Sequence, residues 1–343
     1  MKILIVKLSA FGDIIHCLPA LDDLIQRRQT SEIHWLLDSR YAFVGEILPQ
    51  QVRVHQVSMK GEAPLASVWG SIRELRNIGF DAILDMQGLI KSAVMARSIG
   101  SRVFGIDRSE LREKPAAWLQ TSVCFHPQER HVVQQYRRVA TAPFIDNCRQ
   151  EPGHVIPYAA PHVDLANSSI TGNPDLPKPL QSSNQPYVIL HAAGGWETKQ
   201  LPETTWIAVA DGLLAAGIQP VFSWGNAREQ ELAKKMAEAS IGYALPKRMN
   251  MSALTTLLLG AKAVVGADTG LLHLAAALNT PTITFWGPSA SWRSAPFSEA
   301  QGARHWHIES NPSCGPCFKR TCEDFICMDA IQADAILGAL HDI

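Results

Sequence analysis

The stretch Ala263–Phe285, AVVGADTGLLHLAAALNTPTITF, decides the fold. It opens with a short apolar run (263–266), continues with apolar residues at helical spacing (271–278), and ends with a second apolar, β-branched run (282–285). Two buried strands joined by a helix form the repeating unit of a parallel sheet, because parallel neighbours need a crossover connection. The segment therefore predicts an α/β protein whose parallel sheet carries helices on both faces.

The same alternation extends over most of the chain. It stops between 151 and 186, where Pro, Asn, Ser and Gly dominate, as is typical of a connection without regular structure. We expect further strands at 3–6, 32–37, 52–57, 82–85, 102–105, 187–191 and 220–223, and helices at 14–26, 67–78, 91–99, 204–216, 227–239, 251–259 and 330–340.

These elements predict two Rossmann-like, doubly wound parallel-sheet domains, because 343 residues suit two cores better than one. The domains are expected at 1–150 and 187–328, facing an interdomain cleft. A Pro-rich linker (151–186) joins them, and a closing C-terminal helix lies within 329–343.

Charge and hydropathy restrict the possible partners. The 31 Lys and Arg residues nearly balance the 32 Asp and Glu residues, so no basic field indicates nucleic acid. The apolar run at 3–6 is too short for a secretory signal, and no run of 18 apolar residues indicates a transmembrane segment. We therefore expect a cytoplasmic protein.

The first candidate site is the segment KLSAFGDIIH (7–16), directly after the first strand. Gly12 allows a ligand to approach the backbone, and Asp13 is expected at the carboxyl end of the sheet, where open α/β folds bind ligands. Asp13 is a candidate general base, although a carboxylate here can also serve only as a helix cap. A GxGxxG fingerprint is absent, which argues against a dehydrogenase.

A second candidate site is the segment ADTGLLH (267–273), again between a strand and a helix. The backbone N–H groups of Thr269 and Gly270 point to diphosphate binding at a helix N-terminus. His273 lies about one turn further on. The alternative is that Asp268 and Thr269 only cap the helix and that His273 only packs.

Two further loops follow strands of the same predicted domain. HAAGGWETKQLP (191–202) contains Gly194 and Gly195 and brings Lys199 within reach of a phosphate, although a solvated surface lysine is an equally ordinary interpretation. In the segment WGNARE (224–229), Glu229 could accept hydrogen bonds from a ribose. Together these loops are expected to line one rim of the cleft.

The segments KLSAFGDIIHCLPAL, DMQGLIKSA, HAAGGWETKQLP and GADTGLLHLAAALNTPTITFWGPS, in this order, resemble glycosyltransferase family nine, the lipopolysaccharide heptosyltransferases, and within it the heptosyltransferase I group. The resemblance covers nearly the whole chain. It implies the GT-B fold, an ADP-linked L-glycero-D-manno-heptose donor, a Kdo-lipid A type glycolipid acceptor at the membrane surface, inversion at the anomeric carbon, and no catalytic metal. A peripheral position at the inner face of the inner membrane is also implied.

The resemblance also assigns roles residue by residue. The matching positions are Asp13 and Lys199 (catalytic); Gly194, Gly195, Glu229, Met251, Asp268, Thr269, Gly270, Leu271 and His273 (donor-binding); and Ser9, Gly12, Lys60, Gln87 and Lys91 (acceptor-side, in the first domain).

Two departures from the family pattern leave alternatives open. Enteric members carry Thr-Thr where this chain has Gly194-Gly195, and a basic run near the acceptor loop is reduced here to Lys60. A related transferase with another donor or acceptor, a nucleotide-sugar epimerase and a nucleotide-sugar-binding regulatory protein therefore remain alternatives.

Four cysteines crowd into one segment: Cys314, Cys317, Cys322 and Cys327. Their spacing is compatible with a tetrahedral thiolate site for structural zinc or iron. A reduced cysteine patch or a pair of disulfides is the alternative.

Overall fold

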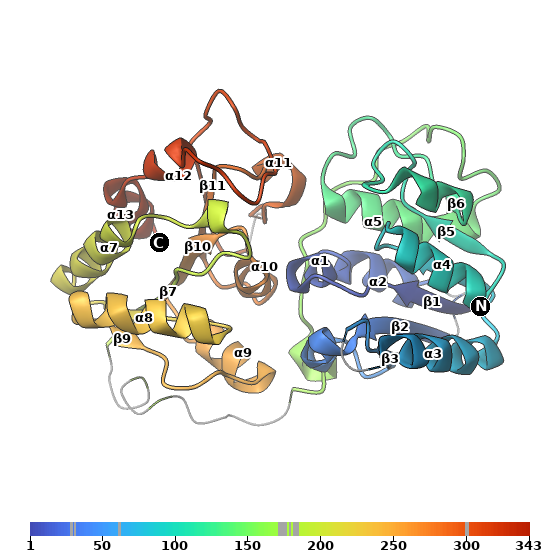
Figure 1. Cartoon of the computed structure of the whole chain (residues 1–343), viewed down its shortest axis with the longest axis horizontal. Coiled ribbons are helices and arrows are strands. Elements are labelled where there is room, and N and C mark those ends of the chain that lie inside the picture. The colour runs from blue at the N-terminus through green and yellow to red at the C-terminus, as the bar shows by residue number, and fades with distance from the viewer. Residues whose placement is uncertain are drawn as a thin grey trace. The chain divides into compact units, whose positions relative to one another are not determined.

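The protein is described by a computed structural model that covers residues 1–27, 30, 32–60, 63–170, 177, 180, 185–298 and 302–343. The chain divides into two compact units, Met1–Ile170 and Thr171–Ile343. Each unit contains its own six-stranded parallel sheet (Figure 1).

The sheet of the first unit has the strand order β3-β2-β1-β4-β5-β6. Leu4 and Val6 of β1 pack with residues of α3 and α4, while Ile3 and Ile5, which alternate to the other face, are also fully buried. Both faces are therefore covered. The strands are β1 (Lys2–Val6), β2 (Glu32–Asp38), β3 (Val52–Val57), β4 (Ala82–Asp85), β5 (Val103–Gly105) and β6 (Thr121–Ser122); the helices are α1 (Phe11–Ile15), α2 (Leu18–Ile25), α3 (Pro64–Ile78), α4 (Ile90–Ile99) and α5 (Val132–Thr141), with 3-10 turns η1 (Ser39–Ile47), η2 (Lys114–Trp118), η3 (Ala142–Phe144) and η4 (Leu165–Asn167).

The sheet of the second unit has the order β12-β11-β10-β7-β8-β9. Its core includes Trp206 of α7, Phe285 of β11 and Ile336 of α13, and α13 packs against α7. The strands are β7 (Tyr187–His191), β8 (Gln219–Phe222), β9 (Tyr243–Ala244), β10 (Ala263–Ala267), β11 (Thr282–Trp286) and β12 (His305–Glu309); the helices are α7 (Glu203–Ala215), α8 (Ala227–Ala239), α9 (Met251–Leu259), α10 (Gly270–Ala277), α11 (Ser291–Ser294), α12 (Ile326–Asp329) and α13 (Ala333–His341), with one 3-10 turn, η5 (Glu197–Lys199).

Both sheets follow one topology. Numbered within its own unit, each has the order 3-2-1-4-5-6, the doubly wound order of dinucleotide-binding folds. The order reverses between β1 and β4 in the first unit and between β7 and β10 in the second. Ligands of such folds bind outside the carboxyl ends of the strands at this switch point. The loops after these four strands are therefore the places to look for a site.

Most expected elements are confirmed, with one correction and several additions. The helix expected at 14–26 is two helices, α1 and α2, because Pro19 lies in the first turn of α2 and cannot continue a helix that began earlier. The additions are α5, β6, β9, β12, α11 and α12, none of which we expected. Over the residues that the structure describes, no helix is long and apolar enough to cross a membrane.

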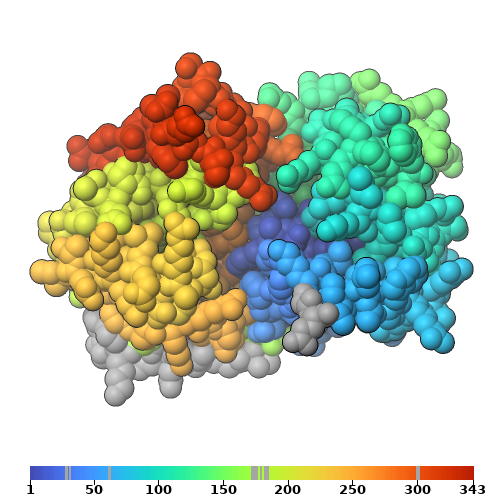
Figure 2. Space-filling view, in the orientation of Figure 1, coloured from blue at the N-terminus to red at the C-terminus, as the bar shows by residue number. Residues whose placement is uncertain are grey.

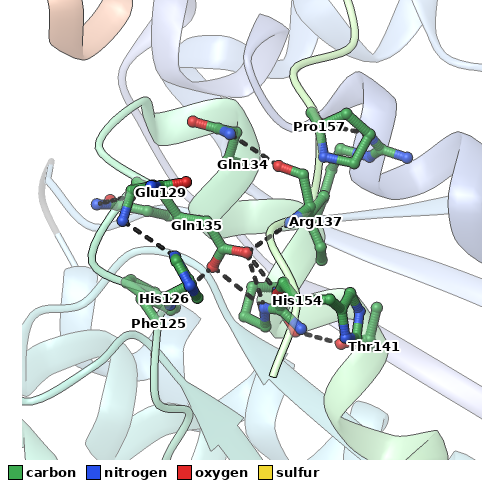
Figure 3. A network of polar contacts seen from close by, with 12 residues as sticks. Phe125, His126, Glu129, Gln134, Gln135, Arg137, Thr141, His154 and Pro157 are labelled. Atoms are coloured by element: carbon green, nitrogen blue, oxygen red, sulfur yellow. Dashed lines mark hydrogen bonds and ion pairs between the residues drawn. The ribbon is translucent and has the colours of Figure 1, made fainter. Parts of the chain in front are cut away.

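The first part of the Pro-rich stretch, from Glu151 to Ile170, belongs to the first unit. A buried ion pair between Glu129 and Arg138 holds it (Figure 3). Glu129 Oε1 accepts a hydrogen bond from the Ile156 N–H (2.8 Å), and Arg138 Nη2 donates one to the His154 carbonyl (2.7 Å). Residues 171–176, 178–179 and 181–184 of the expected linker lie outside the described residues. The proposed limits of the domains stay a prediction.

Candidate active site

At the switch point of the first unit, a buried lysine lies beside an accessible carboxylate. Lys7, the residue after β1, is 2% exposed, whereas the side chain of Asp13 in α1 is 45% exposed. Lys7 Nζ donates hydrogen bonds to the Met86 carbonyl (3.0 Å) and the Tyr136 hydroxyl (2.8 Å), and lies 3.8 Å from Asp13 Oδ2. Burial disfavours the charged form of Lys7, but Asp13 and Tyr136 outweigh it and hold the pKa of Lys7 above its usual value.

The loop after β4 fixes the loop that precedes Asp13. Gln87 Oε1 accepts hydrogen bonds from the backbone N–H groups of Leu8 and Ser9, both at 3.0 Å. Asp85, fully buried, accepts hydrogen bonds from Gln87 N (3.0 Å) and Ser92 Oγ (2.9 Å), and burial raises the pKa of Asp85 to about 6. Gln87 thus has an architectural role that its sequence position did not indicate.

The other acceptor-side candidates lie around the same edge of the first sheet. Gly12 is in the first turn of α1, before Asp13. Lys91 is exposed in the first turn of α4, and Lys60 is exposed shortly before α3 begins. The structure therefore joins Ser9 and Gln87 by a hydrogen bond, places Asp13 four residues after Ser9, and leaves the two lysines exposed.

At the switch point of the second unit, a lysine, an aspartate and a histidine form one cluster. Lys199 Nζ donates hydrogen bonds to Asp268 Oδ2 (2.7 Å) and to the Asp268 carbonyl (2.9 Å), and His273 Nε2 lies 2.9 Å from Asp268 Oδ1. Burial opposes ionisation of Asp268, but Lys199 and His273 outweigh it and hold its pKa well below the usual range. The carboxylate therefore stays charged and fixes the ammonium.

The N-terminus of α10 begins beside this cluster. Thr269 is the N-cap residue but makes no side-chain cap hydrogen bond, and its hydroxyl is buried without a partner among the described residues. The first helical residues, Gly270 and Leu271, contribute N–H groups that have no intrahelical acceptor. An unpartnered hydroxyl beside free N–H groups and a fixed ammonium is suited to an anionic ligand such as a phosphate.

The two glycines of the Lys199 loop differ. A Cβ on Gly194 would lie 3.1 Å from Lys199 Cβ and 3.1 Å from the Trp196 carbonyl oxygen. A Cβ on Gly195 would meet nothing within 4 Å. Gly194 therefore allows the loop to fold closely around Lys199, whereas Gly195 faces open space.

Two donor-side candidates have structural roles of their own. Glu229 Oε2 accepts a hydrogen bond from the Gly225 N–H (2.8 Å) at the start of α8. Met251 opens α9 and is buried. Neither contacts the Lys199–Asp268–His273 cluster through a hydrogen bond, so their donor contacts stay predictions.

A pocket of about 560 Å³ in the second unit is lined by other residues. Its walls include the carboxylates of Glu197, Glu323, Asp324 and Asp329. Four carboxylates disfavour a diphosphate, and neither Lys199 nor Asp268 lines this pocket. It is therefore separate from the candidate donor site.

The expected structural metal site is not supported. Among the residues that the structure describes, which include all four cysteines of the segment, no group of three or more His, Cys, Asp or Glu side chains is arranged to hold a metal ion. Cys314 and Cys322 are exposed, Cys327 is buried, and all are free thiols. Cys322 Sγ instead donates a hydrogen bond to the Asp324 carbonyl (3.0 Å). The spacing suits a tetrahedral site, but the described residues hold no such group of ligands.

The sequence did not indicate three residues of the candidate site: Lys7, Tyr136 and Trp196. Lys7 lies beside Asp13 and donates a hydrogen bond to Tyr136. Trp196 lies under Lys199, whose Nζ is 4.4 Å from the ring centroid. The Arg320 guanidinium is 5.4 Å from the same ring and adds a second cation nearby. A signal was available only for Lys7, a charged residue that directly continues a fully apolar strand.

Comparisons with known proteins agree with this arrangement. The model of glycosyltransferase family 9 (heptosyltransferase) matches residues 68–325. Lipopolysaccharide heptosyltransferase 1 of Pseudomonas aeruginosa is 30% identical over 332 residues, which cover 94% of this chain and 87% of that protein. The same enzyme of Escherichia coli K12 is 31% identical over 302 residues, 84% of this chain and 88% of that protein.

The structure of E. coli heptosyltransferase WaaC with ADP-2-deoxy-2-fluoro heptose has a TM-score of 0.74 at 24% identity, covering 100% of this chain and 99% of that one. This likeness confirms the predicted fold, two Rossmann-like doubly wound domains of the GT-B class. The family resemblance seen in the sequence motifs is confirmed by the match over residues 68–325 and by the two relatives. The chain therefore belongs to glycosyltransferase family 9, the heptosyltransferases, and is a glycosyltransferase.

Proposed function

We propose that this protein transfers L-glycero-D-manno-heptose from ADP-heptose to the inner core of a lipopolysaccharide precursor of the Kdo-lipid A type, with inversion and without a catalytic metal. The observation that carries the proposal is the Lys199–Asp268–His273 cluster beside the open N-terminus of α10. The names of the relatives, lipopolysaccharide heptosyltransferase 1, support the donor and acceptor classes.

On the donor side, the second unit binds the diphosphate of ADP-heptose. Lys199 lies against Asp268, so its position is set before the donor arrives. Thr269 supplies a hydroxyl and α10 supplies backbone N–H groups for the phosphate oxygens. These groups stabilise the charge that develops on the β-phosphate as ADP leaves, the task that a divalent cation performs in other enzymes.

On the acceptor side, Asp13 is the general base. The acceptor hydroxyl oxygen attacks the anomeric carbon from the face opposite ADP, and its proton passes to the Asp13 carboxylate. The bond between the anomeric carbon and the β-phosphate oxygen breaks, and ADP departs with the electron pair. Attack from the opposite face inverts the anomeric configuration. The exposure of Asp13 suits this role, since a base must reach the substrate.

The test is an assay with ADP-heptose and Kdo-lipid A, read by mass spectrometry, with the anomeric configuration of the product determined by NMR. One added heptose per acceptor and an inverted linkage are expected. Transfer only from another nucleotide sugar would contradict the donor assignment. Release of a free or epimerised sugar with no acceptor present would instead identify an epimerase.

Metal independence has its own measurement. Turnover is expected to survive an excess of EDTA, because Lys199 and the N-terminus of α10 act on the leaving diphosphate. Loss of turnover on chelation, restored by added Mg²⁺ or Mn²⁺, would refute the metal-free mechanism.

A further inference from the structure

Large apolar side chains are exposed together on one layer of the first unit. Leu65 and Trp69 of α3 are 74% and 67% exposed, and Trp118 at the end of η2 is 77% exposed. Ile90 and Val94 of α4 are also exposed. Single exposed apolar residues are common on the surfaces of soluble proteins, but a patch of several large ones indicates a surface that binds a partner.

We call these five side chains the Trp69–Trp118 face, because the elements that carry them pack together. Helix α4 packs against both α3 and η2. Leu65 and Trp69 are four residues apart, as are Ile90 and Val94, so each pair shares one side of its helix. The inner sides of α3 and α4 are buried against the sheet, through residues such as Ile72 and Met95, which leaves these pairs outward.

The topology places the face at the functional edge of the sheet. Helices α3 and α4 follow β3 and β4, so both begin at the carboxyl ends of the strands, where Asp13 also lies. The exposed pairs lie within the first two turns of these helices. In Figure 1, α3 and α4 lie beside each other at the front of the first unit, and Figure 2 shows the surface that they form.

The charges around the face are mainly basic. The exposed basic residues on or beside these elements are Lys60, Arg73, Arg76, Lys91, Arg97, Arg108, Arg112 and Lys114, and the exposed acidic residues are Glu74 and Glu110. The nearby acidic groups are partly engaged: Glu113 Oε2 accepts a hydrogen bond from the Ile90 N–H (2.7 Å), and Glu74 Oε1 lies 3.5 Å from His55 Nδ1. The overall charge of the chain is near zero, so this basic surround is local.

We propose that the Trp69–Trp118 face binds the surface of an anionic phospholipid bilayer. Tryptophan prefers the headgroup level of a membrane, where its ring leaves water while its N–H stays hydrated. Lysine and arginine beside it are attracted to lipid phosphates. The charge complementarity favours an anionic bilayer over a second copy of this chain, whose face would be equally basic. The inference rests on the proposed glycolipid acceptor. The bilayer carries this acceptor, and binding through the face would bring Asp13 to the same bilayer.

The test is co-sedimentation of the full chain with vesicles of phosphatidylethanolamine and phosphatidylglycerol, compared with phosphatidylcholine vesicles. The double variant Trp69→Ser/Trp118→Ser removes both rings, and Ile241→Ser, at a fully separate exposed site in the second unit, is the control. Wild type and control should bind the anionic vesicles in a salt-sensitive way. The double variant should bind about tenfold more weakly or worse, since two aromatic side chains no longer leave water.

Equal binding by the double variant and the control, or no binding by the wild type, would overturn the proposal. A wild-type dimer that dissociates in the double variant, seen by sedimentation velocity, would assign the face to a second copy instead. Circular dichroism checks that the double variant is folded. The turnover of the double variant on a deacylated, water-soluble acceptor should equal that of the wild type. If neither protein transfers heptose, the proposed function fails. The vesicle experiment still shows whether the Trp69–Trp118 face binds the bilayer.

Discussion

The two switch points hold the same pair of residue types but differ in the accessibility of the aspartate. In the first unit the lysine is buried and the aspartate is exposed, with 3.8 Å between Lys7 Nζ and Asp13 Oδ2. In the second unit both members are largely buried, and Lys199 Nζ lies 2.7 Å from Asp268 Oδ2. Under the proposed function, the exposed carboxylate of Asp13 accepts the proton of the acceptor hydroxyl. The carboxylate of Asp268, held by Lys199 and His273, instead positions the cation.

This contrast also explains the surrounding contacts. Lys7 is held by a carbonyl and a hydroxyl, so Asp13 Oδ1 and Oδ2 are not both committed to it. Asp268, by contrast, has a partner on each oxygen. Under the proposed function, the same two side chains serve proton transfer in one unit and charge stabilisation in the other, in keeping with their different burial.

The largest expected effect comes from Asp13→Asn. Turnover should fall by about 10²–10⁴-fold, the usual contribution of a general base, while ADP binding by the second unit is kept. Steady-state kinetics and calorimetric ADP titration measure the two quantities. Activity within a few-fold of wild type would remove Asp13 from the role of base and leave the contrast between the two pairs without a catalytic meaning.

Lys199→Ala should have the next largest effect. Turnover is expected to fall by about 10²–10³-fold, and the affinity for free ADP by much less, because the ammonium is needed most as the leaving diphosphate gains charge. Lys234→Ala, at an exposed lysine of α8, is the matched control and should leave both unchanged. Equal losses in turnover and affinity would reduce Lys199 to a binding residue.

Lys7→Met tests whether the buried lysine acts through Asp13. Turnover should fall by about tenfold in the wild-type background, since the charge that faces Asp13 is lost, but little further in the Asp13→Asn background. A purely structural role would instead give the same loss in both backgrounds. Thermal unfolding of each variant separates damage to the fold from this coupling.

The smallest effect distinguishes the two loop glycines. Gly194→Ala should lower turnover a few-fold, because its Cβ would press on Lys199 and the Trp196 carbonyl, and Gly195→Ala should not, because it faces open space. Gly195→Ala is the control for Gly194→Ala, and the measured quantity is the turnover of each variant at a saturating concentration of donor. An equal effect of both would show that the loop, rather than the spacing around Lys199, is sensitive.

The sequence predicted the fold well where apolar periodicity is strong. The strands at the centre of each sheet are short apolar runs, and every one of them was expected. Helix α5 was missed because Gln and Arg interrupt its apolar face, and β12 was missed because three of its five residues, His305, His307 and Glu309, are ionisable. The break between α1 and α2 depends on Pro19 alone.

The candidate site was predictable by position but not by environment. A residue that follows a strand of a parallel sheet must lie at the carboxyl edge, so Asp13 and Asp268 could be named. The contact between Lys7 and Tyr136 joins residues 129 positions apart, and no local pattern reports it. Burial, which distinguishes the two aspartates, is likewise a property of the folded unit. The cysteine spacing predicted a metal site that the described residues do not support, because spacing along the chain does not by itself fix how the sulfurs are arranged.

The anchoring of residues 151–170 in the first unit has a consequence for recombination between relatives. A crossover at residue 150 would join Glu129 and Arg138 to a foreign segment and endanger the hydrogen bonds to Ile156 and His154. The two charges would keep each other, but a buried polar group that loses a hydrogen-bond partner costs stability. A crossover just after Ile170 keeps the ion pair together with residues 151–170, which its side chains contact. Chimeras that exchange the second unit between family members should therefore be more stable with the later junction than with the earlier one, as thermal unfolding would measure.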